Sequence, residues 1–198
     1  MASKKKNILV KVVVDSREQD LGFLEKFKFD KKYSTEKIKI ESYEIQTPFK
    51  CVDSNGKILK TSTGDIGIEY SFDDGLTWNK TNLSIELKKD SDFTSTLYSN
   101  WKRFSKELDR VKENDLDFYI VYNQSTSKMH EHFDKLKSMK RIPYYATPHK
   151  VVYDRMLEIG DRNITMIFTH EIHEVIKRII KHHIKKNKLQ YDEKNVDI

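Results

Sequence analysis

The stretch between residues 63 and 92 constrains the fold more than any other part of the chain. Apolar and polar residues alternate from Gly64 to Phe72 and again from Leu83 to Lys89, a period of two that is typical of β-strands. Asp73-Asp74-Gly75 separates the two runs and is a strong hairpin-turn signal. The stretch therefore predicts a β-hairpin with one buried and one polar face.

The turn also predicts a register. If Asp74 and Gly75 form a two-residue turn, paired residues sum to 149, and Asp65 lies opposite Ser84. Glu86 is then the diagonal neighbour of Asp65 on the same face. Lys88 follows on that face, opposite an apolar face of Ile66, Ile68, Ile85 and Leu87. A one-residue bulge between residues 79 and 82 would change this parity.

The polar face of this hairpin holds two carboxylates and a lysine. Asp65 and Glu86 carry the oxygen ligands that Mg²⁺ prefers, and such an ion polarises a phosphoryl oxygen and acidifies a bound water. Lys88 is placed to orient that water and to neutralise charge developing on a phosphate. An amphipathic hairpin with a solvated charged face is the alternative, because 34% of the chain is charged.

Composition indicates a globular protein with a polyanionic partner. The chain has 198 residues, enough for one domain, and its net charge is +6. A lysine-rich protein without such a partner is the alternative. Cys51 is the only cysteine, which favours a reducing compartment, cytoplasmic or nuclear rather than secreted. No apolar run is long enough to span a membrane, so no membrane partner is expected.

The remaining patterns predict alternating strands and helices. The expected strands are Ile8–Asp15, Tyr33–Gln46, Leu116–Tyr122 and Ile164–Phe168, and a tight turn is expected at residues 54–56. The expected helices are Gln19–Phe27, one long helix beginning near Asp90, Ser125–Met139, Pro148–Ile159 and His170–Lys188. We expect a single domain at residues 8–188, between a disordered basic N-terminus at 1–7 and a flexible tail at 189–198.

The long helix carries an apolar stripe, with Asp90, Ser91 and Asp92 as candidate N-caps. The stripe is formed by Phe93, Leu97, Trp101, Phe104, Leu108 and Val111. The main cations of this helix are Lys102, Arg103, Lys106 and Arg110. The last helix is basic on its other side, with Lys177, Arg178, Lys181, Lys185, Lys186 and Lys188. This side either lies on DNA or is solvated.

Three blocks stand in order along the chain: VDSREQ, GD, and IELKKDSDF followed by RFSKELDRV. Together they resemble the nuclease domain of the XPF family, whose motifs run V-D-x-R-E, G-D-[YF] and E-R-K-x-x-x-D. The resemblance covers roughly residues 8–122. It implies a restriction-endonuclease-like α/β fold, in which helices flank a central mixed β-sheet.

The resemblance also implies roles for individual residues. Asp65, Glu86 and Lys88 match the catalytic residues, and the metal ligands would be Asp65, Glu86 and the backbone carbonyl of Leu87. Asp15, Arg17, Glu18 and Asp92 border the site. Ile66 replaces the aromatic residue of the second motif, and Leu87 replaces the arginine of the third. The helix-hairpin-helix module of many members is absent, and no further cofactor-binding residues are expected.

These features predict a Mg²⁺-dependent DNA endonuclease, with Mn²⁺ as a substitute, acting on nicked, flap or branched DNA in repair, recombination or replication. The alternatives are an inactive DNA-binding or partner subunit of the same fold, and a restriction or junction-resolving nuclease. The expected DNA contacts are Arg17, Lys102, Arg103, Lys181 and Lys185. The resemblance further suggests a homodimer or heterodimer formed through residues 143–184.

Overall fold

A computed structural model of the chain describes residues 8–17, 38–46, 49–61, 63–139 and 148–187. It divides into two compact units, residues 1–83 with 173–198 and residues 84–172. Each unit is described by itself, so the expectation of a single domain at 8–188 stays a prediction. The expected helix Gln19–Phe27 and both terminal segments lie outside the described residues.

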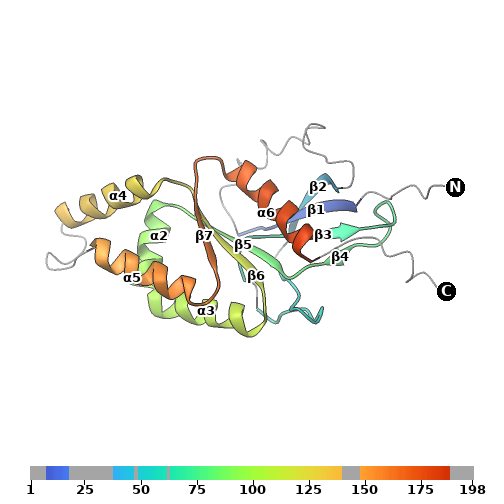
Figure 1. Cartoon of the computed structure of the whole chain (residues 1–198), viewed down its shortest axis with the longest axis horizontal. Helices are drawn as coiled ribbons and strands as arrows, with labels where there is room; N and C mark the ends of the chain where they lie inside the picture. The colour runs from blue at the N-terminus through green and yellow to red at the C-terminus, as the bar shows by residue number, and fades with distance from the viewer. Residues whose placement is uncertain (1–7, 18–37, 47–48, 62, 140–147, 188–198) are drawn as a thin grey trace. The chain divides into compact units, whose positions relative to one another are not determined.

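A mixed sheet forms the first unit (Figure 1). Its central strand β1 (Ile8–Asp15) pairs in parallel with β2 (Ile38–Gln46) and antiparallel with β3 (Ile66–Ser71). Seven of the eight residues of β1 are buried, as its β-branched sequence ILVKVVVD requires of a central strand. The parallel and antiparallel neighbours together make the sheet mixed.

The hairpin turn forms as the sequence predicts. Asp74 and Gly75 both have positive φ, 57° and 87°, which is the conformation of a two-residue turn that matches strand twist. Glu69 pairs with Lys80 and Tyr70 with Asn79 in β4 (Asn79–Lys80), so the register sum of 149 is confirmed at this end. Asp73 and Ser71 stabilise the turn by accepting backbone N–H bonds from Thr77 and Gly75.

In its described residues, the second unit contains four helices and three strands. Its strands are β5 (Leu83–Lys88), β6 (Asp117–Tyr122) and β7 (Thr165–Phe168), in the order β5-β6-β7 with β6 and β7 parallel. Its helices are α2 (Asp90–Leu97), α3 (Trp101–Glu113), α4 (Thr126–Ser138) and α5 (Pro148–Gly160). One apolar cluster joins them, and it contains the whole predicted stripe from Phe93 to Val111.

The prediction of one long helix after Asp90 is wrong, because the helix is interrupted between Leu97 and Trp101. Tyr98 has a non-helical backbone (φ −106°, ψ −88°), and the Asn100 N–H bonds to the carbonyl of Ser95. Side chains of Ser95 and Ser99 bond to backbone carbonyls, a local competition that weakens helices. The N-cap is also not one of the expected residues but Lys89, and it makes no side-chain capping bond.

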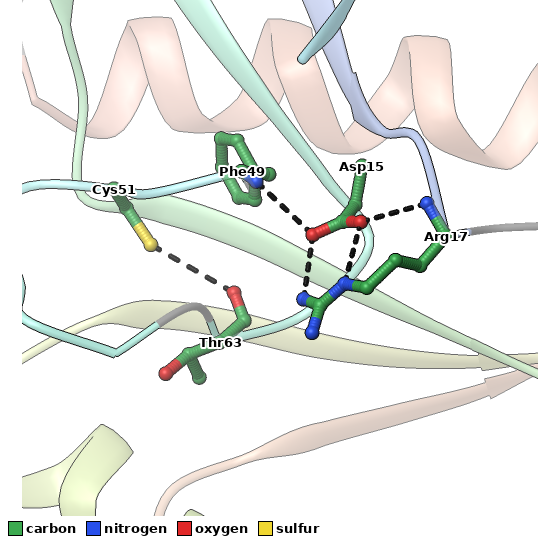
Figure 2. Close-up of polar contacts among 5 residues, drawn as sticks. All are labelled: Asp15, Arg17, Phe49, Cys51 and Thr63. Carbon is green, nitrogen blue, oxygen red and sulfur yellow. Dashed lines mark hydrogen bonds and ion pairs between the residues drawn. The ribbon is translucent and has the colours of Figure 1, made fainter. Parts of the chain in front are cut away.

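Helix α6 (Ile172–Lys186) belongs to the first unit from His173 onward and lies beside its sheet in both views (Figures 1 and 2). Its apolar side is buried as predicted, including Ile176, Ile180 and Ile184. No helix in the described part of the chain combines the length and apolar character needed to cross a membrane. The predicted fold class, α/β with a mixed sheet and helices, is confirmed.

Candidate active site

In the first unit, the carboxylate of Asp15 is buried and fully engaged (Figure 2). Arg17 donates to it twice from its guanidinium, Nε to Oδ1 at 2.9 Å and Nη2 to Oδ2 at 2.7 Å, and once from its backbone N–H. The backbone N–H of Phe49 completes the set at 3.0 Å from Oδ2. The Arg17 guanidinium and these N–H groups hold the pKa of Asp15 below its ordinary value, against the opposing effect of burial.

Asp65 is the cross-strand neighbour of Asp15. Continuing the β1–β3 register by one position beyond Val14 and Ile66 pairs the two residues, and the Asp15 N–H bonds to the Asp65 carbonyl at 2.8 Å. Residues directly opposite in an antiparallel pair share a face of the sheet. Asp15 therefore lies beside Asp65 on the sheet. Gly64 allows this entry into β3 because its φ is +75°, which other residues adopt only with strain.

In the second unit, a carboxylate–lysine pair lies on β5. Glu86 and Lys88 are two residues apart and share a face, and their Oε1 and Nζ atoms are 2.6 Å apart. Both are buried, with 9% and 8% of their surface exposed. Lys88 Nζ also donates to Oδ2 of Asp92, at 2.8 Å, in the first turn of α2. One ammonium thus bridges two carboxylates where β5 meets the following helix.

The Lys88 ammonium stays charged in this position. Burial alone lowers the pKa of a lysine, but the charge of Glu86 and the hydrogen bond to Asp92 outweigh burial and raise the pKa of Lys88 above its ordinary value. The Nζ atom lies 5.6 Å from the centre of the Phe104 ring of α3, within the range of a cation–π contact. Lys88 is therefore a fixed cation and not a proton donor or base.

A third carboxylate, Glu107 of α3, lies near Glu86 and Lys88, although no sequence motif includes it. Burial raises the pKa of Glu107, and the charge of Glu86 raises it further, while Lys88, Arg110 and Arg103 act in the opposite direction. Its position three residues after Phe104 is the signal that could have identified it. A glutamate at the edge of an apolar stripe lies beside whatever that stripe packs against.

The structure brings some of the predicted residues together within each unit. Within one unit it joins Glu86, Lys88 and Asp92, and within the other it joins Asp15, Arg17 and Asp65. The convergence of Asp65 with Glu86 and the role of the Leu87 carbonyl stay predictions. Glu18 lies outside the described residues.

The expected DNA contacts differ in exposure. Lys102, Arg103 and Lys185 are exposed, and Lys181 is half-buried. Lys177 was expected on the basic side of α6, but it is buried and lies 3.3 Å from Glu174. Lys188 lies outside the described residues.

The donor chemistry fits a hard cation. Mg²⁺ is usually bound through one or two carboxylates and keeps several waters, and Glu86 provides such a carboxylate beside the half-buried Glu107. Among the described residues, no group of three or more histidine, cysteine, aspartate or glutamate side chains is arranged around an ion position. The carboxylates present therefore fit an ion that keeps several waters, rather than one enclosed by protein ligands.

Comparisons with known proteins give similarity in structure only. No family model matches the chain, and no curated protein matches it in sequence. The solved structures that are similar include two of XPF from Aeropyrum pernix. The first, a complex with DNA, has a TM-score of 0.46 and 16% identity, and the match covers 89% of this chain and 66% of that one. The second has a TM-score of 0.48 and 16% identity, with 90% and 68% covered.

Proposed function

We propose that this chain is a metal-dependent DNA endonuclease, with Mg²⁺ as its ion and nicked, flap or branched DNA as its substrate. The observation that carries the proposal is the buried Glu86–Lys88 pair at the start of α2, with Asp92 as the second partner of the lysine. A buried lysine that is held charged beside a carboxylate suits the stabilisation of a phosphate transition state. The order of the VDSREQ, GD and IELKK blocks supports the same chemistry.

Each residue has a distinct role in this proposal. Glu86 and the carbonyl of Leu87 would hold the ion, and the motif resemblance adds Asp65 as a ligand. The ion would supply Lewis-acid chemistry at the phosphate when it is bound. Lys88 orients the attacking water and neutralises charge on the phosphate, because its ammonium stays protonated. When Glu86 binds the ion, Asp92 still holds the Lys88 ammonium, because the Asp92 carboxylate lies 2.8 Å from Nζ. Mn²⁺ replaces Mg²⁺, because both accept oxygen ligands.

The DNA partner is supported by charge. The chain carries a net charge of +6, and exposed cations include Lys102, Arg103 and Lys185. Phosphate contacts displace condensed counterions, so DNA affinity falls steeply as salt rises. Arg17 contributes less than a free arginine, because Asp15 already occupies two of its donors.

Assembly through residues 143–184 is part of the proposal. Two large side chains of α5 in this range, Tyr153 and Leu157, are 53% and 68% exposed and lie one helical turn apart. A dimer provides two sites and cuts both strands of a duplex, whereas a monomer nicks. Sedimentation of the intact protein with and without Leu157→Glu distinguishes these states. A monomer that cuts both strands in one turnover would contradict the dimer.

A panel of labelled DNA substrates tests the function. Linear, nicked, flap, forked and four-way DNA are incubated with the protein with no metal and with Mg²⁺, Mn²⁺ or Ca²⁺. We expect cleavage with Mg²⁺ and Mn²⁺ on nicked or branched DNA, and binding without appreciable cleavage with Ca²⁺, whose larger and looser shell places the water poorly. Binding without cleavage under every condition would replace the nuclease with an inactive DNA-binding subunit. Cleavage of one linear sequence alone would favour a restriction enzyme.

A further inference from the structure

Helix α3 has two flanks that meet different surroundings. Its buried stripe contains Phe104 and Leu108. On one side of the stripe, Arg162 donates to Ser105 Oγ and Asp109 Oδ1, at 2.8 Å in each case. On the other side, helical spacing places Arg103, Glu107 and Arg110 in one row, at steps of four and three residues. We call this row the arginine flank.

The arginine flank faces the Glu86–Lys88 pair. Lys88 Nζ lies over the ring of Phe104, which is next to Arg103 in the chain and one turn before Glu107. Charges of Glu86 and Lys88 act on Glu107, and so do those of both arginines. Since the opposite flank is occupied by Arg162, the arginine flank is the side of α3 that a phosphate at Lys88 would meet.

The two arginines remain available for a ligand. Both are exposed, and within the described ranges neither guanidinium takes part in an ion pair. Arg162 and Arg17 differ in this respect, because each donates to a carboxylate at 2.7–2.9 Å. A planar guanidinium with several donors is well suited to the oxygens of a phosphodiester.

We propose that Arg103 and Arg110 bind two backbone phosphates of one nucleic-acid strand, on either side of the phosphate held at Glu86 and Lys88. This inference rests on the proposed nuclease function and adds the residues that set the position of the strand. Their spacing of seven residue steps corresponds to about 10.5 Å along the helix axis. Phosphates of one strand rise about 3.4 Å per nucleotide, so the two arginines would contact phosphates about three nucleotides apart.

We call Arg103 and Arg110 together the clamp. Glu107 separates the two phosphate-binding positions of the clamp. Its carboxylate lies between the two arginines on the helix surface and repels a phosphate that approaches the midpoint. Phosphates are therefore bound at the two arginine positions rather than anywhere along the row. A smooth basic surface would instead allow the strand to slide.

The same helix offers a matched control. Lys106 and Lys112 are exposed cations of α3, and helical geometry places both outside the arginine flank. Removing them changes the net charge by the same amount as removing the arginines. A general attraction of the helix for DNA predicts equal effects, whereas the clamp predicts unequal ones.

Binding of a labelled nicked duplex in Ca²⁺, measured by fluorescence anisotropy between 50 and 200 mM salt, separates these cases. We expect Arg103→Gln/Arg110→Gln to reduce the slope of log K against log salt by about 2, since each phosphate contact contributes about 0.9. We expect Lys106→Gln/Lys112→Gln to reduce it by less than about half as much. Thermal melting of each variant checks the fold, which exposed residues should leave unchanged.

Single-turnover cleavage in Mg²⁺ provides a second readout. The arginine double variant should shift the position of the cut or broaden it over neighbouring nucleotides, while the lysine double variant cuts at the original position. Equal slopes and equal cut positions for the two double variants would overturn the clamp, with the nuclease intact. A flat salt dependence of the unaltered protein would overturn the proposed function itself, and the clamp with it.

Discussion

Two charged centres of this protein, one in each unit, differ in how completely their charges are satisfied. In the first unit, one buried carboxylate, Asp15, accepts four hydrogen bonds from Arg17 and Phe49, and its pKa is lowered. In the second unit, Lys88 pairs with both Glu86 and Asp92, and the pKa of the neighbouring Glu107 is raised. The first arrangement is a structural ion pair. In the second, two carboxylates share one ammonium, which leaves one negative charge for a bound cation.

The comparison suggests a division of labour. A carboxylate whose acceptor positions are filled by fixed donors stabilises the backbone segments that it joins, here the end of β1 and the segment at Phe49. Carboxylates that share one ammonium are instead able to exchange it for an ion. Sequence motifs treat the two centres alike, since both are Asp or Glu beside Arg or Lys at the end of a strand.

The largest expected effect is on chemistry at the second centre. Lys88→Ala should lower the single-turnover cleavage rate by a factor of about 10²–10³, because it removes the fixed charge beside the scissile phosphate. Asp65→Asn, in the first unit, should cause a loss of similar size, because the motif resemblance makes Asp65 an ion ligand. Lys89→Ala, at the exposed next residue, serves as the control and should cleave normally. Normal rates for Lys88→Ala would assign the chemistry to another site.

The next effect in size is on stability, at the first centre. Asp15→Ala leaves the N–H of Phe49 buried without an acceptor and should lower the free energy of unfolding in urea by about 1–3 kcal/mol. Asp53→Ala is the matched control, because Asp53 also accepts two backbone N–H bonds but from the exposed residues Asn55 and Lys57. An equal loss for both variants would show that burial of Asp15 has no special importance.

Glu107→Gln should change stability in the opposite direction. Because the folded state raises the pKa of Glu107, its ionised form costs stability at pH values above the unfolded pKa, about 4.3. The variant should therefore melt at a higher temperature than wild type at pH 7, and the difference should vanish as the pH falls below about 4. Glu113→Gln, at the exposed end of α3, should not change melting. A lower melting temperature at pH 7 would show that Glu107 is satisfied like Asp15.

The smallest effect is expected at the hairpin turn. Hydrogen bonds from Ser71 and Thr77 lower the pKa of Asp73 to about 2. Its contribution to stability is therefore present above the unfolded pKa of about 3.9 and is lost as the pH falls toward about 2. Asp73→Asn should lower the melting temperature slightly at pH 7 and leave the cleavage rate unchanged. A cleavage defect in a folded Asp73→Asn protein would connect this turn to the chemistry.

Much of the fold could be predicted because its strands and helices have strong periodic patterns. The strand Ile8–Asp15 agrees with its prediction at both ends. Helix α4 lies within its expected range, and the expected limits, Ser125 and Met139, are its two caps. The break between α2 and α3 could not be predicted from the stripe, which continues through it. The interruption depends on side-chain bonds of Ser95 and Ser99 to the backbone, which compete with the helix without changing the apolar spacing.

The site could be predicted only where neighbouring residues in the chain form it. Glu86 and Lys88 follow from a period of two along one strand. The Phe49 N–H that reaches Asp15 is 34 residues distant in sequence, and no local pattern indicates it. Glu107 is an intermediate case, because its place beside the apolar stripe can be read from the sequence, whereas its relation to Lys88 depends on how α3 packs against β5.

The central claim is that the Glu86–Lys88 pair performs the chemistry and the Asp15–Arg17 pair stabilises the fold. Single-turnover cleavage of nicked DNA in Mg²⁺ by wild type, Glu86→Gln and Asp15→Asn, each at a temperature where it is fully folded, tests this most directly. The account predicts a loss of about 10²–10³ for Glu86→Gln and a rate near that of wild type for Asp15→Asn. Cleavage by Glu86→Gln at the wild-type rate, or an equal loss in folded Asp15→Asn, would contradict it.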